Sequence, residues 1–219
     1  MTTTPLRRAS VIDEVRAAIR ERILDGELTP GRPLREAELV DAYGVSRHTV
    51  RAALRALAGD GLVRLEPDRG ASVAALGRDG LIGLWELRTA LETEAARLAL
   101  ERAPAELHRH LATALDELRV ACSAHPPDRP AIDRAHDQLH AAIVGAAHSE
   151  RIERAYAALA TEQRLFLLQL RGAWGPERMV DHHRVLAVRL AAGDLETIRA
   201  HLREGAAALL GEARGSGTP

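Results

Sequence analysis

The sequence predicts a mainly α-helical protein in two parts, a small N-terminal domain of three helices with a two-stranded hairpin and a C-terminal bundle made of helices alone. Apolar residues recur at helical spacing over most of the 219 residues. Only 2% of residues are aromatic, so the cores must be built from aliphatic side chains and alanine. Short strand-like runs lie within residues 62–75, and from about residue 80 the pattern stays helical.

The N-terminal elements are defined by caps and turn residues. Gly44 ends the second helix, at a turn where a left-handed backbone favours glycine, and Ser46 is a good N-cap for the third. Pro67 and Gly70 mark the tip of a hairpin. The predicted helices cover residues 10–24, 36–43 and 47–58, and the predicted strands cover residues 62–66 and 71–75.

The C-terminal part reads as a series of amphipathic helices joined by short turns. The one proline-rich loop is His125–Pro130, and the last six residues are rich in glycine and serine. The predicted helices cover residues 82–102, 104–123, 131–146, 150–171, 176–192 and 195–212. We therefore predict a DNA-binding domain at 1–76, a helical domain at 80–213 and a disordered tail at 214–219.

Composition excludes several classes of protein. The single Cys122 cannot form an internal disulfide, and no run of about 18 apolar residues exists to cross a membrane. The first residues lack the apolar core of a secretory leader, so we expect a soluble cytoplasmic protein without a membrane partner. The formal net charge of −1 means that any argument for nucleic-acid binding rests on where the arginines lie.

The third predicted helix carries its charges on one face near its start. Arg47, His48 and Arg51 lie opposite the apolar stripe of this helix. A recognition helix presents such side chains to the major groove, where arginine pairs with guanine or phosphate. Arg69 and Gly70 at the hairpin tip would reach a neighbouring groove or the backbone. The alternative is an ordinary solvated helix face, and the spacing alone does not decide between the two.

The order and spacing of several motifs add to this reading. The strings are Gly31-Arg-Pro-Leu-Arg-Glu-Ala-Glu-Leu39, Gly44-Val-Ser-Arg-His-Thr-Val-Arg-Ala-Ala-Leu54, Asp60-Gly-Leu-Val63 and Gly70-Ala-Ser-Val73. Together they resemble the GntR family of winged helix-turn-helix regulators, which implies a homodimer on a palindromic double-stranded operator. With the helix face and the hairpin tip, it gives the candidate DNA contacts Arg35, Ser46, Arg47, His48, Thr49, Arg51, Arg69 and Gly70, where Arg35 would replace the arginine that the family often has at the position of Ala37. Ala37 and His48-Thr49 depart from the common family residues, so the operator sequence does not follow.

The helical part resembles the FCD ligand-sensing domain, the C-terminal partner in the FadR subfamily. The string Glu86-Leu-Arg-Thr-Ala-Leu-Glu-Thr-Glu-Ala-Ala-Arg-Leu-Ala99 matches its opening helix, and Leu139-His140 and Gly193-Asp194 extend the match. The resemblance implies a small metabolite, typically an organic acid, as effector. Its candidate contacts are Arg88, His140 and His183. Arg88 could equally form an ion pair with Glu92, one turn along the same helix.

Histidines at helical spacing raise the question of a metal. His136 and His140 lie one turn apart and would face the same side of a helix, where two imidazoles chelate a divalent ion. Many FCD domains bind a metal, and the resemblance assigns ligand roles to His140 and His183. His136 stands where the family has Asp, and Gly205 stands where it has a final His. Two readings stay open, a site such as Zn²⁺ on His136, His140 and His183, with Asp133 or His201 as a further ligand, or a bundle without metal.

The sequence thus favours a regulator, most simply a repressor, that is released from or retuned on its operator by a bound metabolite, and not an enzyme. One alternative is a DNA-binding dimer that senses no ligand. Another is a metal-dependent helical enzyme, against which stands the lack of a paired general acid and base at convincing spacing.

Overall fold

The computed structural model describes residues 10–171 and 173–212, which form two compact units divided between Ala75 and Leu76. The tail predicted to be disordered, residues 214–219, lies outside the described residues. Among the described helices, none is long and apolar enough to cross a membrane. Each unit is built around its own core, so the two are described separately.

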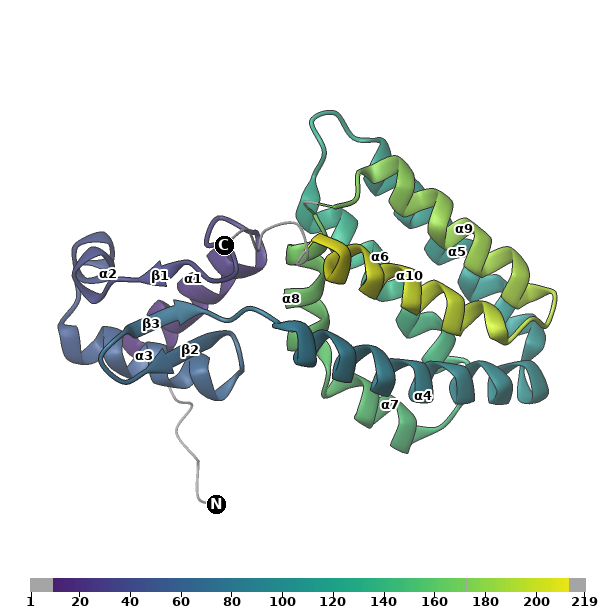
Figure 1. The fold of residues 1–219 in the computed structure, drawn as a ribbon, viewed down its shortest axis with the longest axis horizontal. Coiled ribbons are helices and arrows are strands. Elements are labelled where there is room, and N and C mark those ends of the chain that lie inside the picture. Colours follow the sequence, from purple (N-terminus) through teal and green to yellow (C-terminus); the bar gives the residue numbers. More distant parts are fainter. Residues whose placement is uncertain (1–9, 172, 213–219) are drawn as a thin grey trace, which may run out of the picture. The chain divides into compact units, whose positions relative to one another are not determined.

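Unit 1 contains the three predicted helices and a small antiparallel sheet (Figure 1). The predicted hairpin is present, and its second strand also pairs with a two-residue strand that was not predicted, giving the order β1-β3-β2. That strand escaped prediction because it is very short and begins at a proline. The elements are α1 (Val11–Leu24), β1 (Pro33–Leu34), α2 (Glu36–Tyr43), α3 (Arg47–Gly59), β2 (Val63–Glu66) and β3 (Gly70–Val73).

Local hydrogen bonds fix where the helices of unit 1 begin and end. Ser10 and Asp13 form a capping box at the start of α1, each side chain accepting from the other's backbone N–H. Gly44 adopts a left-handed φ of 63° and ends α2. Ser46 then accepts a hydrogen bond from the Thr49 N–H, 3.1 Å away, and starts α3. These caps hold α3 in a defined direction after the turn.

The core of unit 1 is aliphatic and is supported by one ion pair. The Arg16 guanidinium donates to both carboxylate oxygens of Asp60, with N–O distances of 2.7–3.0 Å, and so joins α1 to the end of α3. This bidentate contact links residues 44 positions apart, so no local pattern announces it. The fully buried side chains that pack α1 against α3 are Ile19, Ile23, Leu54 and Leu57.

The described residues of unit 2 form helices joined by loops, with no strand. Its first helix begins four residues earlier than expected, and the single helix predicted over 150–171 is wrong. The chain turns more tightly at Ala158 and Leu159, whose N–H groups bond to Arg154 and Tyr156, and this turn buries both Tyr156 and Leu159. The helices are α4 (Arg78–Arg102), α5 (Pro104–Ser123), α6 (Arg129–Gly145), α7 (Glu150–Ala157), α8 (Ala160–Leu170), α9 (Pro176–Ala191) and α10 (Glu196–Glu212).

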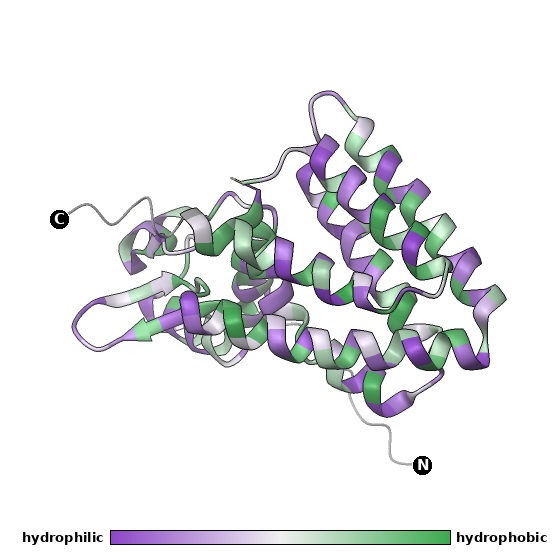
Figure 2. Cartoon of the chain, turned by 45° about the vertical axis from the view of Figure 1, so that its right-hand side comes forward, coloured by the Kyte–Doolittle hydropathy of each residue, from purple (hydrophilic) through white to green (hydrophobic). Residues whose placement is uncertain are grey.

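The helices of unit 2 pack pairwise around one large aliphatic core. Helix α5 contacts both α6 and α9, and α10 lies along α4 (Figure 1). Hydrophobic and hydrophilic residues both occur on the helices of unit 2 (Figure 2), and helices such as α5 and α9 bury mainly apolar side chains.

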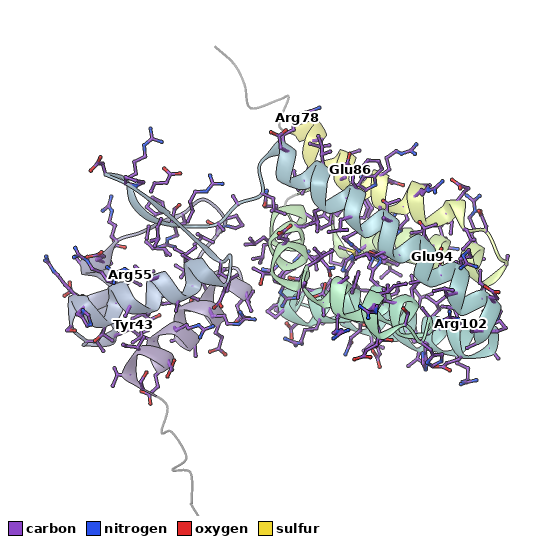
Figure 3. The ribbon with its side chains drawn as sticks, turned by 90° about the horizontal axis from the view of Figure 1, so that it is seen from below. Tyr43, Arg55, Arg78, Glu86, Glu94 and Arg102 are labelled. Carbon is purple, nitrogen blue, oxygen red and sulfur yellow. The ribbon has the colours of Figure 1, made fainter. Side chains whose placement is uncertain are left out.

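Helix α4 buries two charged side chains. Arg78, Glu86, Glu94 and Arg102 are exposed positions along α4 (Figure 3). The buried positions of α4 carry apolar residues together with Arg88 and Glu92, both almost fully buried. Charged side chains are rarely buried unless they are paired, so the Arg88–Glu92 pair identifies a candidate functional site in the core of unit 2.

Candidate functional site: a histidine-lined cavity and an arginine-bearing helix

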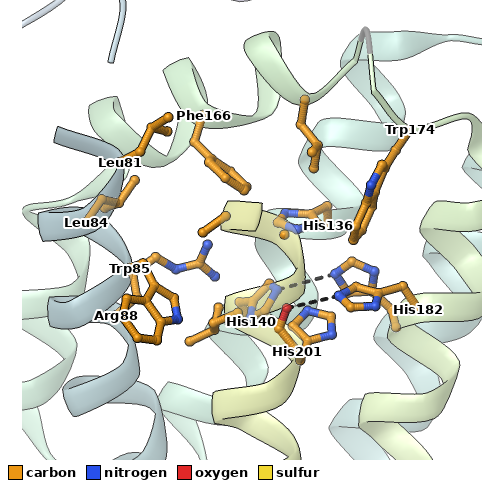
Figure 4. A pocket seen from close by; sticks show the side chains of 15 residues that line it. Leu81, Leu84, Trp85, Arg88, His136, His140, Phe166, Trp174, His182 and His201 are labelled. Carbon is orange, nitrogen blue, oxygen red and sulfur yellow. Dashed lines mark hydrogen bonds between the residues drawn. The ribbon is translucent and has the colours of Figure 1, made fainter. Parts of the chain in front are cut away.

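A small cavity lies within unit 2, among the side chains of five helices (Figure 4). Its free volume is about 20 Å³, enough for a water molecule or a metal ion. Apolar side chains from α4, α8 and α10 close one part of it, and Trp174, between α8 and α9, closes another. Its polar lining is Arg88, His136, His140, His182, His183 and His201.

Three of the predicted histidines meet in this cavity. One ring nitrogen from each of His136, His140 and His183 lies within 4.8 Å of the others, and all three side chains are buried. His140 Nδ1 lies 2.7 Å from the Glu92 carboxylate, and His183 Nδ1 lies 2.7 Å from the Met179 carbonyl oxygen. The Met179 carbonyl only accepts, and Glu92 only accepts as the carboxylate of its ion pair with Arg88, so each Nδ1 carries a proton and each Nε2 of a neutral ring presents a lone pair.

The two Nε2 atoms lie close to one another. The Nε2 atoms of His140 and His183 are 3.3 Å apart. An added proton could join them, but burial, reinforced by neighbouring charges, holds the pKa of both rings well below the ordinary value. Burial likewise lowers the pKa of His136 to about 3. Neutral imidazoles that face each other with lone pairs are the arrangement a divalent cation binds.

Glu92 organises the cavity from behind the histidines. One of its carboxylate oxygens accepts from Arg88 Nε and the other from His140 Nδ1, each at 2.7 Å. Burial raises the pKa of this carboxyl, and the neighbouring Arg88 charge opposes that shift. The ion pair with Arg88 was one of the two alternatives that the spacing allowed. The contact with His140 was missed, because it joins residues 48 positions apart.

The two remaining candidate ligands, His201 and Asp133, have different surroundings. His201 packs 4.6 Å from the His183 ring and stacks on His182 at 3.8 Å, and its Nδ1 is buried without a hydrogen-bond partner among the described residues. The Asp133 carboxylate pairs with the guanidinium groups of Arg171 and Arg164.

Gly205 also borders the cavity. A Cβ atom placed there would lie 3.4 Å from the Phe166 ring. The Phe166 ring therefore occupies the space beside position 205, where the family resemblance expects a histidine.

The predicted DNA contacts in unit 1 form a different kind of surface. Arg47, His48 and Arg51 are exposed on the first turns of α3, and Arg55 follows on the same helix (Figure 3). Arg51 is held by the Glu36 carboxylate at 2.8 Å.

The other predicted contacts of unit 1 divide between the cap of α3 and exposed ion pairs. The hydroxyls of Ser46 and Thr49 lie 2.9 Å apart in the cap. The Arg35 and Arg69 side chains are 76% and 85% exposed, each beside a glutamate, and Gly70 has a φ of 83° at the hairpin tip.

Comparison with known proteins places both units. The model of the bacterial regulatory proteins of the gntR family matches residues 11–73, and that of the FCD domain matches residues 83–207, more than half of the chain. A probable D-xylose utilization operon transcriptional repressor of Paenarthrobacter nicotinovorans is 32% identical over 95% of this chain and 91% of its own length. The galactonate operon transcriptional repressor of Escherichia coli K12 is 27% identical, over 69% of this chain and 73% of that protein.

A solved structure agrees with these matches. A GntR transcriptional regulator from Rhodococcus sp. RHA1 superposes with a TM-score of 0.68 at 25% identity, covering 94% of this chain and 99% of that one. The family and these relatives are transcriptional regulators and not enzymes. The chain is therefore a member of the GntR family of bacterial transcriptional regulators, of the FadR-like kind in which a winged helix-turn-helix precedes an FCD ligand-sensing domain.

Proposed function

We propose that this regulator is a cytoplasmic homodimeric repressor that binds a palindromic operator. Its affinity for the operator would be set by a small anionic metabolite, bound beside a divalent metal in the cavity of unit 2. The observation that carries the proposal is that the Nε2 atoms of His140 and His183 lie 3.3 Å apart while the Nδ1 of each ring contacts an acceptor. Without a cation between them, two buried acceptors would repel.

The residues around the cavity suit a metal such as Zn²⁺. His136, His140 and His183 would hold the ion, with neutral rings as metal binding requires. Glu92 and the Met179 carbonyl fix the tautomers of two of these rings, as the acceptors behind metal-bound histidines do. A bound ion supplies a positive centre for a carboxylate. His201, whose Nδ1 has no partner, is the candidate for a fourth ligand.

The effector belongs beside this ion. Arg88 borders the same cavity as the three histidines, so an acid placed there meets a guanidinium as well as the ion. The operons named for two relatives, for D-xylose use and for galactonate, make a sugar or sugar-derived acid a reasonable class to test first. The free volume of about 20 Å³ is too small for such a molecule, so binding must displace side chains. Such a displacement is how a ligand can favour one conformation of the sensor.

The operator would be bound by the exposed face of α3 and by the hairpin tip. Arg47, His48 and Arg51 would enter the major groove, while Arg35, Arg69 and Gly70 would contact neighbouring backbone. The Ser46 and Thr49 side chains would serve by holding the start of α3, whose free N–H groups attract phosphate. One recognition helix reads few bases, so two copies of the chain would supply the rest of the specificity.

Metal analysis tests the sensor half. We expect about one Zn²⁺ per chain after dialysis, and a higher Tm on Zn²⁺ addition. His140→Ala and His183→Ala should abolish both effects, while His108→Ala, at an exposed position of α5, should leave them unchanged. Wild-type protein that retains no metal and gains no stability from it would overturn the metal site and favour a DNA-binding dimer without a ligand.

Operator binding tests the other half. With a duplex selected from a random library by the wild-type protein, Arg47→Ala and Arg51→Ala should each weaken binding about tenfold or more at unchanged Tm. Arg20→Ala, an exposed arginine of α1, is the matched control. Undiminished binding by both α3 variants would refute the assignment of this helix.

A further inference from the structure

The two tryptophans of the chain both border the cavity of unit 2 (Figure 4). Trp85 is on α4, and Trp174 lies between α8 and α9. Each indole Nε1 is buried, and neither has a hydrogen-bond partner among the described residues. An indole N–H can only donate, so both lack an acceptor.

Trp174 is held firmly in this position. Its side chain is 3% exposed, the Arg178 guanidinium carbon lies 4.7 Å from its ring centroid, and the His182 ring packs edge-on at 4.5 Å. A side chain fixed in this way meets a ligand without having to be ordered first. Trp85, on α4, is half-buried.

We propose that Trp85 and Trp174 are specificity-determining residues, whose N–H groups bind oxygen atoms of the effector other than the carboxylate. The inference rests on the proposed function, in which the carboxylate binds at the metal and Arg88. The remaining donors of the cavity then require further acceptors on the same small molecule. Hydroxyl groups on the carbon chain supply them, so the effector is a hydroxycarboxylate and not a plain alkyl carboxylate.

The chemistry of the cavity also excludes neutral polyols as good ligands. Arg88 and the proposed ion outweigh the negative charge of Glu92, and Asp137, which lies 3.5 Å from His136, is paired with Arg164, so the cavity favours an anion. A plain carboxylate satisfies this charge but leaves two buried donors unpaired, and each unpaired donor lowers affinity about tenfold. A polyol without a carboxylate satisfies the donors and not the charge.

A matched set of probes separates these possibilities. Full-length Zn²⁺-loaded protein is titrated with D-galactonate, D-gluconate and D-xylonate, with hexanoate as an acid without hydroxyls, and with D-galactose as a polyol without a carboxylate. Tryptophan emission reports binding, because both tryptophans border the cavity, and calorimetry confirms it. We expect at least one hydroxy acid to bind ten times or more tightly than hexanoate, and D-galactose not to bind.

Single Trp→Phe variants test the residues themselves. Trp174→Phe and Trp85→Phe keep an aromatic ring and remove the donor, so each should weaken hydroxy acid binding about tenfold while hexanoate binding stays the same. If the buried Trp174→Phe variant fails to fold, the half-buried Trp85→Phe carries the test. The remaining tryptophan still reports binding in either variant.

The inference is overturned if hexanoate binds as tightly as every hydroxy acid, if no acid binds, or if the variants bind the hydroxy acid as the wild type does. Its failure is distinguishable from that of the proposed function. Retained Zn²⁺ together with tight hexanoate binding would leave the metal and anion site standing and remove only the indole contacts. Loss of Zn²⁺ from the wild type would instead remove the metal from the proposed function.

Discussion

Unit 1 displays its candidate functional charges to solvent, whereas unit 2 buries them. The Arg69 side chain is 85% exposed, while Arg88 is 4% exposed and His183 only 1%. An exposed arginine makes weak ion pairs and can exchange them for phosphate with little loss. A buried ion pair has no such freedom, because removing one partner leaves the other uncompensated. Function and stability should therefore be separable in unit 1 and inseparable in unit 2.

The largest effect that tests this contrast between the units is expected for Glu92→Ala. The change strands the buried Arg88 guanidinium and removes the acceptor of His140 Nδ1. We expect the free energy of unfolding of unit 2 to fall by about 3–5 kcal/mol and Zn²⁺ binding to be lost with it. Urea denaturation followed by circular dichroism, with metal analysis, measures both.

Glu94→Ala is the matched control for Glu92→Ala. Glu94 lies two residues along α4 at an exposed position (Figure 3). It pairs with Arg97. Neither stability nor metal binding should change in this variant. A Glu92→Ala protein as stable as Glu94→Ala would break the contrast between the units.

The two units should also differ in how strongly salt weakens their binding. Operator binding through exposed arginines releases counterions, so affinity should fall steeply as salt rises. Arg47→Ala should reduce that salt slope by about one if it removes a phosphate contact, and weaken binding about tenfold at unchanged Tm. Zn²⁺ binding inside unit 2 should vary little over the same range, because buried charges are poorly screened. Filter binding and calorimetry at a series of NaCl concentrations test this, and equal salt dependence at both sites would contradict it.

The same contrast explains what could be predicted from sequence. Caps and turn glycines are local, so Ser46 and Gly44 identified the ends of α2 and α3. The pair His136 and His140 was visible because residues one turn apart share a helix face. Spacing alone does not predict that His183 and Trp174 join the cavity. The family resemblance assigned His183, and Trp174 belongs to no helix. The contacts of Glu92 with His140 and of Arg16 with Asp60 depend on packing between distant segments, which no local pattern contains.

Ser46→Ala changes a residue of unit 1 that should contribute both to stability and to operator binding. Its hydroxyl is exposed yet caps α3, so we expect unit 1 to lose about 1 kcal/mol of stability. Operator binding should weaken as well, because the start of α3 frays. Ser10→Ala, which removes the cap of α1, should lower stability similarly and leave operator binding intact. Thermal melts and gel shifts on both variants measure the difference, and identical operator binding by the two would remove Ser46 from the DNA-binding surface.

The smallest expected effect is that of Gly205→Ala. It is the most informative about unit 2, because stability should rise while ligand binding weakens. Gly205 lies inside α10, where alanine favours the helix by about 0.5–1 kcal/mol, and its new Cβ would lie 3.4 Å from the Phe166 ring, within ordinary contact. Gly205→Ala should therefore stabilise unit 2 slightly while narrowing the cavity, so Tm should rise and hydroxy acid binding should weaken. Gly211→Ala, in the same helix with open space around it, should not weaken ligand binding. A drop in stability at Gly205→Ala would mean that Phe166 cannot yield, and that the cavity wall is more rigid than ligand entry requires.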